Sequence, residues 1–170
     1  MPTVCWMWRN IFIRGTQAKS RGSRLLDLNP GRRPDRERLS MTFKRMQQLQ
    51  LKGKRVLIRE DFNVALSDGE IDNDTRIRAA LPTIEMAVSM GAHVILMSHL
   101  GRPAEGKLIS EQAQYSLQPV AARLSELLRT RVNLVQDYLG VVPTTAAAGD
   151  ISLLENVRIN AGEKANDDGL

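Results

Sequence analysis

Four short apolar runs recur along this chain between residues 55 and 155, and longer polar segments separate them. Each run is rich in Val, Ile and Leu and is mainly apolar instead of strictly alternating, which is typical of strands buried in a parallel sheet. Such strands must be covered by other layers of structure, so this pattern constrains the fold strongly. The runs occupy residues 55–59, 93–97, 132–135 and 151–155.

The segment between the first two runs has the periodicity of a helix. Its apolar residues fall three and four positions apart, and Gly91 is placed to end it. Asp74 or Thr75 can cap its start, which predicts a helix from there to about Met90. Pro82 lies within this segment and either kinks the helix or moves its start.

A second helix is expected from Leu117 to Leu128, with Ser116 as its cap and Pro119 tolerated in its first turn. Val142-Pro143 then opens a loop with room for a short helix. Apolar strands that alternate with helices predict an α/β fold, a doubly wound, Rossmann-like parallel sheet with helices on both faces.

Charge divides the chain at about residue 40. Residues 1–40, which we call the leader, contain nine Lys or Arg against three Asp or Glu, whereas residues 41–170 contain 15 against 16. The folded part therefore lacks the basic stripe expected of a nucleic-acid-binding domain. A nucleic-acid contact by the leader ranks low, because basic and aromatic residues are not interleaved there. We expect no nucleic-acid partner.

The leader shows no sustained helical or strand period, and we expect it to be disordered. Its arginine-rich, acid-poor composition is typical of an organelle transit peptide, although no clear amphipathic helix forms. A flexible basic arm that contacts phosphates is a second interpretation. The third, which we favour, is that translation starts at Met41 and the leader is upstream sequence. We therefore expect one domain over residues 41–170.

Other features narrow the class of protein. No stretch approaches the roughly 18 to 20 consecutive apolar residues that span a bilayer, so no membrane partner is expected. Cys5 is the single cysteine, which excludes an internal disulfide and suits a cytoplasmic location. Two histidines and one cysteine make a zinc site improbable. Neither G-x-x-x-x-G-K-[ST] nor G-x-G-x-x-G occurs.

Charged and polar side chains follow three of the four runs, where parallel strands direct their carboxyl ends to one edge. Guanidinium groups pair well with carboxylate and phosphate oxygens, so this rim suits a small polyanion. Its residues are Arg59, Asp61 and Asn63 after the first run, Arg76 at the start of the first helix, His99 and Arg102 after the second run, and Arg158 after the fourth.

Each rim residue also has a purely structural interpretation. A single arginine at a strand end is most often a solvated surface charge, and His99 could be a structural histidine. Asp61 can cap a loop, and Arg59 can pair with Glu60 or Asp61 without touching a ligand. Placement after three separate strands supports a shared binding site more than any one of these residues does alone, and both interpretations stay open. His93 lies within a strand and is interpreted as structural.

Five segments stand in an order that adds a further argument. They are G-K-R-V-L-I-R-E-D-F-N-V (53–64), R-I-R-A-A-L-P-T-I (76–84), S-H-L-G-R-P (98–103), Y-S-L-Q-P-V (115–120) and L-E-N-V-R (154–158). In this order they resemble the N-terminal domain of the phosphoglycerate kinase family, over nearly all of residues 44–165. The shared A-L-P-T-I run also accounts for Pro82 in a helical pattern.

The resemblance implies a glycolytic kinase. Its reaction is the reversible transfer of a phosphoryl group between 1,3-bisphosphoglycerate with ADP and 3-phosphoglycerate with ATP. The resemblance also implies that the N-terminal domain holds the glycerate, that a C-terminal domain holds Mg-ATP or Mg-ADP, and that full-length members are usually monomers.

Carried over position by position, the resemblance gives the rim residues roles in binding the glycerate. Asp61 and Asn63 would contact its carboxyl and hydroxyl end. His99, Arg102 and Arg158 would hold the phosphate that is not transferred.

Arg59 would assist the phosphate contacts, and Arg76 would be the catalytic residue that reaches the transferring phosphoryl group. Ala65 and Ile159 depart from a usual proline and a usual aromatic residue, and both changes look structural. Family members are more than twice as long, and the residues that bind the Mg-nucleotide are absent here. We therefore expect this chain alone to lack activity. The alternative is an isolated, non-catalytic domain that binds 3-phosphoglycerate.

Overall fold

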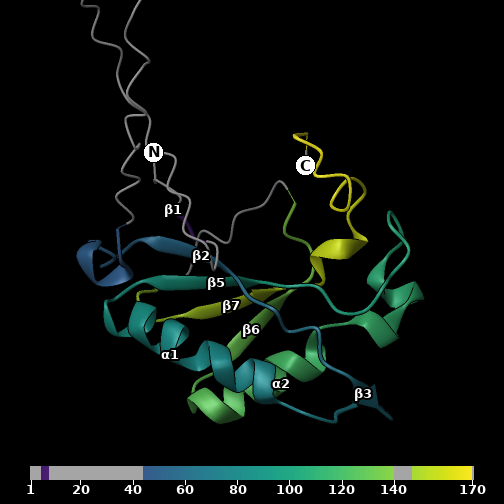
Figure 1. Ribbon diagram of the computed structural model, residues 1–170, viewed down its shortest axis with the longest axis horizontal. Coiled ribbons are helices and arrows are strands. Elements are labelled where there is room, and N and C mark those ends of the chain that lie inside the picture. The colour runs from purple at the N-terminus through teal and green to yellow at the C-terminus, as the bar shows by residue number, and fades with distance from the viewer. Residues whose placement is uncertain (1–4, 8–43, 140–146, 170) are drawn as a thin grey trace, which may run out of the picture.

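A five-stranded parallel sheet forms the centre of the molecule (Figure 1). The computed structural model describes residues 5–7, 44–139 and 147–169. The strand order is β1-β2-β5-β7-β6, and every neighbouring pair is parallel. The α/β fold class is thus confirmed. The strands are β1 (Cys5–Met7), β2 (Arg55–Arg59), β5 (His93–Met97), β6 (Val132–Val135) and β7 (Ile151–Leu154).

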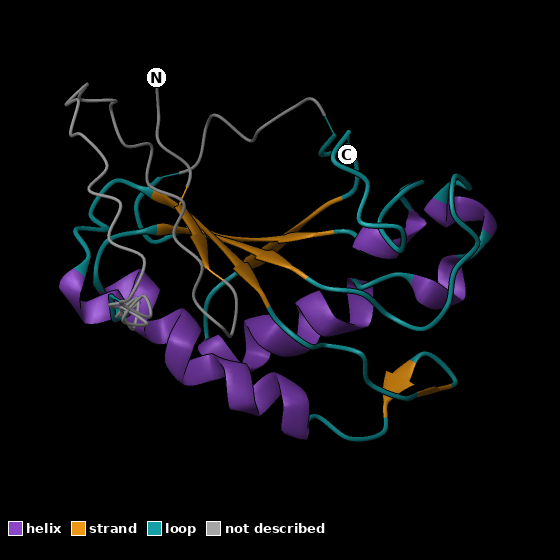
Figure 2. Ribbon diagram, turned by 45° about the horizontal axis from the view of Figure 1, so that its top comes forward, coloured by secondary structure: helices purple, strands orange, loops and turns teal. Residues whose placement is uncertain are grey.

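Both long helices pack against the same face of this sheet (Figure 2). They are α1 (Thr75–Ser89), between β2 and β5, and α2 (Gln118–Leu128), between β5 and β6. Both connections step across the sheet in the same direction, and right-handed crossovers then place both helices on one side. Helices were expected on both faces of the sheet. Within the described ranges, the long helices cover one face. The loop at Val142-Pro143 lies outside these ranges.

The core lies between the sheet and the two helices. Alternate side chains of the strands enter it, as shown by Val56 and Ile58 of β2 and by Val94 and Leu96 of β5, which are at most 2% exposed. The register aligns these positions across the sheet, with Val56 beside Val94 and Val94 beside Ile151. A parallel strand that is buried in this way must be mainly apolar. The apolar runs of the sequence therefore predicted the positions of β2, β5, β6 and β7.

The start of α1 differs from the expectation. The side chain of Asp74 makes no capping hydrogen bond, and Asn73 Oδ1 instead accepts from the backbone N–H of Thr75 at 2.8 Å. The Asp74 carboxylate accepts from Arg78 and Arg123, so its charge joins α1 to α2. The prediction of a side-chain cap by Asp74 or Thr75 was therefore wrong, because two arginines compete for the carboxylate.

The start of α2 agrees with the expectation to within one residue. Leu117 and not Ser116 occupies the capping position and makes no side-chain capping bond, but Ser116 Oγ accepts from the backbone N–H of Gln118 at 3.2 Å. Pro82 lies inside α1, which continues through it. No helix in the described part of the chain is both long and apolar enough to cross a bilayer.

Several short elements complete the fold. A hairpin of β3 (Leu66–Ser67) and β4 (Glu70–Ile71) turns at Asp68-Gly69, where both residues have positive φ angles of 53° and 85°. Four 3-10 helices were not predicted: η1 (Met46–Gln48), η2 (Ile109–Glu111), η3 (Ala113–Tyr115) and η4 (Val157–Ile159). The strand β1, which pairs with the outer edge of β2, was not predicted either.

Candidate functional site

Three loops leave the sheet at the carboxyl ends of β2, β5 and β7, and hydrogen bonds join them into one rim. The buried Ser98 Oγ accepts from the backbone N–H of Phe62 at 2.9 Å, and the carbonyl oxygen of Ser98 accepts from the backbone N–H of Val157 at 3.0 Å. Asn63 Oδ1 accepts from the backbone N–H of Gly101 at 2.8 Å. These bonds hold the loops in fixed relative positions.

The loop after β5 is held from a second side. Asn156 is fully buried, and its Nδ2 donates to the carbonyl oxygens of Leu100 at 2.8 Å and Tyr115 at 2.9 Å. Gly101 has a φ of +62°, and a Cβ there would lie 2.7 Å from the ring of Tyr115. The S-H-L-G-R-P segment therefore needs glycine at this position for space as well as for backbone conformation.

Glu155 connects the end of β7 to the start of α2. Its side chain is fully buried, and Oε1 accepts from the backbone N–H groups of Leu117 at 2.7 Å and Asn156 at 2.9 Å. Its Oε2 accepts from the hydroxyl of Ser116 at 2.8 Å. A buried carboxylate needs such donors, so Glu155 acts as a structural anchor of the rim.

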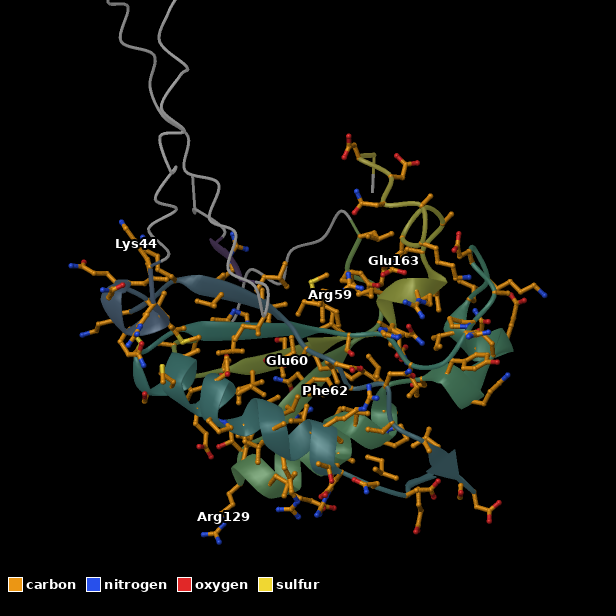
Figure 3. The ribbon with its side chains drawn as sticks, in the orientation of Figure 1. Lys44, Arg59, Glu60, Phe62, Arg129 and Glu163 are labelled. Atoms are coloured by element: carbon orange, nitrogen blue, oxygen red, sulfur yellow. The ribbon has the colours of Figure 1, made fainter. Side chains whose placement is uncertain are left out.

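A single carboxylate joins two arginines of the rim. Arg59 Nη2 donates to Glu163 Oε1 at 2.9 Å, and Arg158 Nε donates to Glu163 Oε2 at 3.3 Å. Figure 3 shows the side chains of Arg59 and Glu163 at the upper side of the sheet, close to η4. Burial by itself would raise the pKa of Glu163, but the bonds from the two arginines outweigh it and lower the pKa below its ordinary value.

His99 lies within the electrostatic reach of this cluster. Burial lowers the pKa of the half-buried imidazole, and the positive charges of Arg158 and Arg59 lower it further. The negative charges of Asp61 and Glu163 oppose the shift without cancelling it. The neutral imidazole is therefore favoured, and a dianionic ligand would shift the balance toward the imidazolium.

Asp61 and Arg76 form an ion pair at the outer side of the rim. Their side chains are 50% and 53% exposed, so the pair is well solvated. Asp61 Oδ1 also accepts from the backbone N–H of Asn63 at 3.2 Å. An exposed pair of this kind contributes little stability and can open for a ligand at low cost.

Arg102 is exposed and follows Gly101 directly in the loop after β5. No ion pair joins it to another residue in the described part of the chain. The other predicted site residues are connected through hydrogen bonds, ion pairs or electrostatic interactions at the carboxyl edge of the sheet: Arg59, Asp61, Asn63, Arg76, His99 and Arg158.

Glu155, Asn156 and Glu163 were not singled out from the sequence. The first two belong to the L-E-N-V-R segment, but most of their partners lie in distant segments of the chain. Glu163 lies in a stretch without regular periodicity. No simple sequence pattern points to it.

Two cavities are lined by none of the predicted site residues. One of about 780 Å³ is bordered by Leu108, Tyr138 and Ile159, and none of the predicted site residues lines it. Another of about 630 Å³ lies between the start of α1 and Arg123 of α2. Within the described ranges, no group of three or more His, Cys, Asp or Glu side chains could hold a metal ion.

Comparison with known proteins gives a consistent result. The family model for phosphoglycerate kinase matches residues 46–170. The phosphoglycerate kinase structure from Coxiella burnetii is 48% identical, with a TM-score of 0.67, over 73% of this chain and 30% of that chain. The phosphoglycerate kinase from Pyrococcus horikoshii OT3 is 31% identical, with a TM-score of 0.62, over 71% of this chain and 29% of that chain. The chain thus spans less than a third of either solved protein, and it belongs to the phosphoglycerate kinase family.

Proposed function

We propose that the rim binds 3-phosphoglycerate and 1,3-bisphosphoglycerate and so supplies the glycerate half of a reversible phosphoryl transfer. The observation that carries this proposal is that Arg59 of β2 and Arg158 of η4, which are far apart in the sequence, both bind one carboxylate within electrostatic reach of His99. Guanidinium groups that converge in a half-buried site suit a phosphorylated acid.

In this proposal the two ends of the glycerate meet different groups. Arg102, Arg158 and His99 hold the phosphate that is not transferred, and Arg59 assists them. Asp61, which pairs with Arg76 of α1, and Asn63 contact the carboxyl and hydroxyl end. Asn63 also positions the loop that carries Arg102, because its side-chain oxygen accepts a hydrogen bond from the N–H of Gly101.

The transfer itself requires positioning and charge balance more than proton movement. A terminal phosphate oxygen of ADP forms a bond to the phosphorus of the acyl phosphate, while the bond from phosphorus to the acyl oxygen breaks. The glycerate carboxylate leaves with the electron pair, so no general base is needed. Arg76 is the catalytic residue in this proposal, because it leaves its exposed pair with Asp61 and offsets charge on the transferring group.

The Mg-nucleotide is proposed to bind outside the residues that the structure describes. These residues include no cluster of acids that could hold a metal ion, and the sequence has no glycine-rich phosphate loop of the P-loop type. We therefore propose that this chain by itself binds the glycerate without turnover. We also propose that the reaction belongs to glycolysis in the cytoplasm and that the full-length protein is a monomer.

Titration of the chain with 3-phosphoglycerate, followed by NMR, tests the binding site. We expect the His99 resonances to shift, and the shift to be lost in Arg102→Ala. Arg131→Ala is the matched control, because Arg131 is exposed and precedes β6 at the opposite edge of the sheet. A His99 shift that survives unchanged in Arg102→Ala contradicts the site assignment.

A coupled assay for ATP formation from 1,3-bisphosphoglycerate and Mg-ADP tests the second half of the proposal. We expect no measurable rate with this chain alone. Turnover that is lost in Arg76→Ala would show that the chain is itself an active kinase.

A further inference from the structure

Glu163 accepts hydrogen bonds from two arginines of the rim, Arg59 and Arg158. Arg59 ends β2, and Arg158 lies in η4 after β7, with β5 between these strands in the sheet. The carboxylate of Glu163 accepts one hydrogen bond from each guanidinium, at 2.9 Å on Oε1 and 3.3 Å on Oε2. Glu163 thus connects the carboxyl ends of two strands that are not neighbours.

Burial places the carboxylate behind the arginines. The side chain of Glu163 is 11% exposed, whereas those of Arg59 and Arg158 are 27% and 24% exposed. The guanidinium groups are therefore more open to a ligand from solvent than the carboxylate of Glu163 is. This order distinguishes a supporting carboxylate from one that occupies the place of the ligand.

Two arginines directed at one site face two physical difficulties. Their like charges repel in a partly buried environment, and their long side chains lose rotamer entropy when a ligand fixes them. A shared carboxylate reduces both, because it balances part of the charge and restricts the side chains before the ligand arrives. Each guanidinium has five N–H donors, and Glu163 takes one from each.

We propose that Glu163 is a positioning residue for the anion site, and that it orders Arg59 and Arg158 for the phosphate of the glycerate. This inference rests on the proposed function for the identity of the ligand. The ordering of the two arginines is a property of the ligand-free protein, so it can be measured separately.

Glu163→Gln tests the inference. The amide keeps the size of the side chain, but its NH₂ group is a donor and cannot accept from the second guanidinium. We expect 3-phosphoglycerate to bind about tenfold more weakly by calorimetry, the effect of one lost charge-assisted hydrogen bond. In the ligand-free protein we expect the slowly exchanging Nε–H signal of Arg158 in a ¹⁵N spectrum to disappear.

Two further variants serve as controls. Glu105→Gln also removes one negative charge, but Glu105 pairs with Lys164 at 3.2 Å and not with a rim arginine, so binding should stay unchanged. Glu163→Asp restores the charge on a shorter side chain and should recover part of the affinity. A purely structural role would lower the unfolding temperature in Glu163→Gln without these selective effects.

The outcomes separate the possibilities. Equal or tighter binding in Glu163→Gln would show that the carboxylate competes with the ligand, and it would overturn the inference. An Arg158 Nε–H signal that persists in Glu163→Gln would overturn it as well. Failure of the unmodified chain to bind 3-phosphoglycerate would overturn the proposed function instead, while the ligand-free arginine signal would still decide whether Glu163 orders Arg158.

Discussion

Among single residues, Gly101 shows how tightly the rim is packed. Its φ of +62° is unfavourable for other residues, and a Cβ would lie 2.7 Å from the ring of Tyr115. We expect Gly101→Ala to lower the free energy of unfolding by about 2 kcal/mol or more, through backbone strain and overpacking. Urea denaturation measures this loss, and 3-phosphoglycerate binding should fall with it because Arg102 moves.

Gly106 provides the matched control in the same loop. Its φ is +75°, yet a Cβ there would have no neighbour within 4 Å. Gly106→Ala should therefore cost only the backbone term, about 1 kcal/mol, and leave binding intact. Equal losses in the two variants would show that the ring of Tyr115 yields easily and that the close packing is unimportant.

His93 makes folding sensitive to acid. Its side chain is 4% exposed, its Nδ1 has no hydrogen-bond partner, and its Nε2 lies 3.2 Å from Ser152 Oγ. Burial lowers the pKa of His93 below its ordinary value of 6.5, although the charge of Asp150 acts in the opposite direction. The unfolded chain therefore binds this proton at a higher pH than the folded chain does.

The sign of the effect follows from this difference. Stability is fully present above the unfolded pKa and declines as the pH falls through it toward the folded pKa, by at most about 1.4 kcal/mol per pH unit. We expect the free energy of unfolding to fall less between pH 7 and pH 5 in His93→Gln than in the unmodified chain. Parallel curves would contradict this role, since all other groups are common to both proteins.

At the scale of elements, Glu155 ties β7 to α2. Glu155→Ala would leave the buried N–H groups of Leu117 and Asn156 without their acceptor. We expect the free energy of unfolding to fall by about 3 kcal/mol, the cost of unsatisfied buried donors. Glu126→Ala in α2 is the control, because that side chain is 64% exposed and should cost less than about 0.5 kcal/mol. Similar losses in both variants would contradict the anchoring role.

The sequence predicted the regular elements because their cause is local. The boundaries of β2, β5 and β6 were predicted correctly, since an apolar run and the turn residues beside it define a buried strand. The start of α1 was predicted, but its cap was not. The carboxylate of Asp74 binds Arg123, which lies 49 positions away, and no local pattern contains that contact.

The position of the rim was also predictable in part, and its role as a binding site stays a prediction. The rim residues at strand ends were predicted because parallel topology brings carboxyl ends to one edge. The residues that support them were not, because Glu163 and Asn156 act through contacts with backbone or side chains of other loops. Local sequence therefore indicates which charged and polar groups gather at the carboxyl edge of the sheet, whereas the groups that hold them depend on the folded arrangement.

At the scale of the whole molecule, the leader contributes β1 to the edge of the sheet. The strand places Trp6 beside Leu57 in a parallel pair at the outer edge of β2. On the other side of β2, Lys54 O accepts from His93 N–H and Glu60 N–H donates to Met97 O. Because backbone groups alternate along a strand, the even-numbered positions of β2 face β5 and the N–H of Leu57 faces β1.

Deletion of residues 1–40 tests the prediction that residues 41–170 form the domain. A chain that lacks residues 1–40 should fold and bind 3-phosphoglycerate unchanged, because the rim residues lie between Arg59 and Arg158. In hydrogen exchange, the amide of Leu57 should lose protection, whereas those of Val56 and Ile58 should keep theirs through β5. Loss of protection at all three amides, or loss of binding, would show that the leader is an integral part of the fold. Full retention of protection at Leu57 would show that β1 contributes no stable pairing to the sheet.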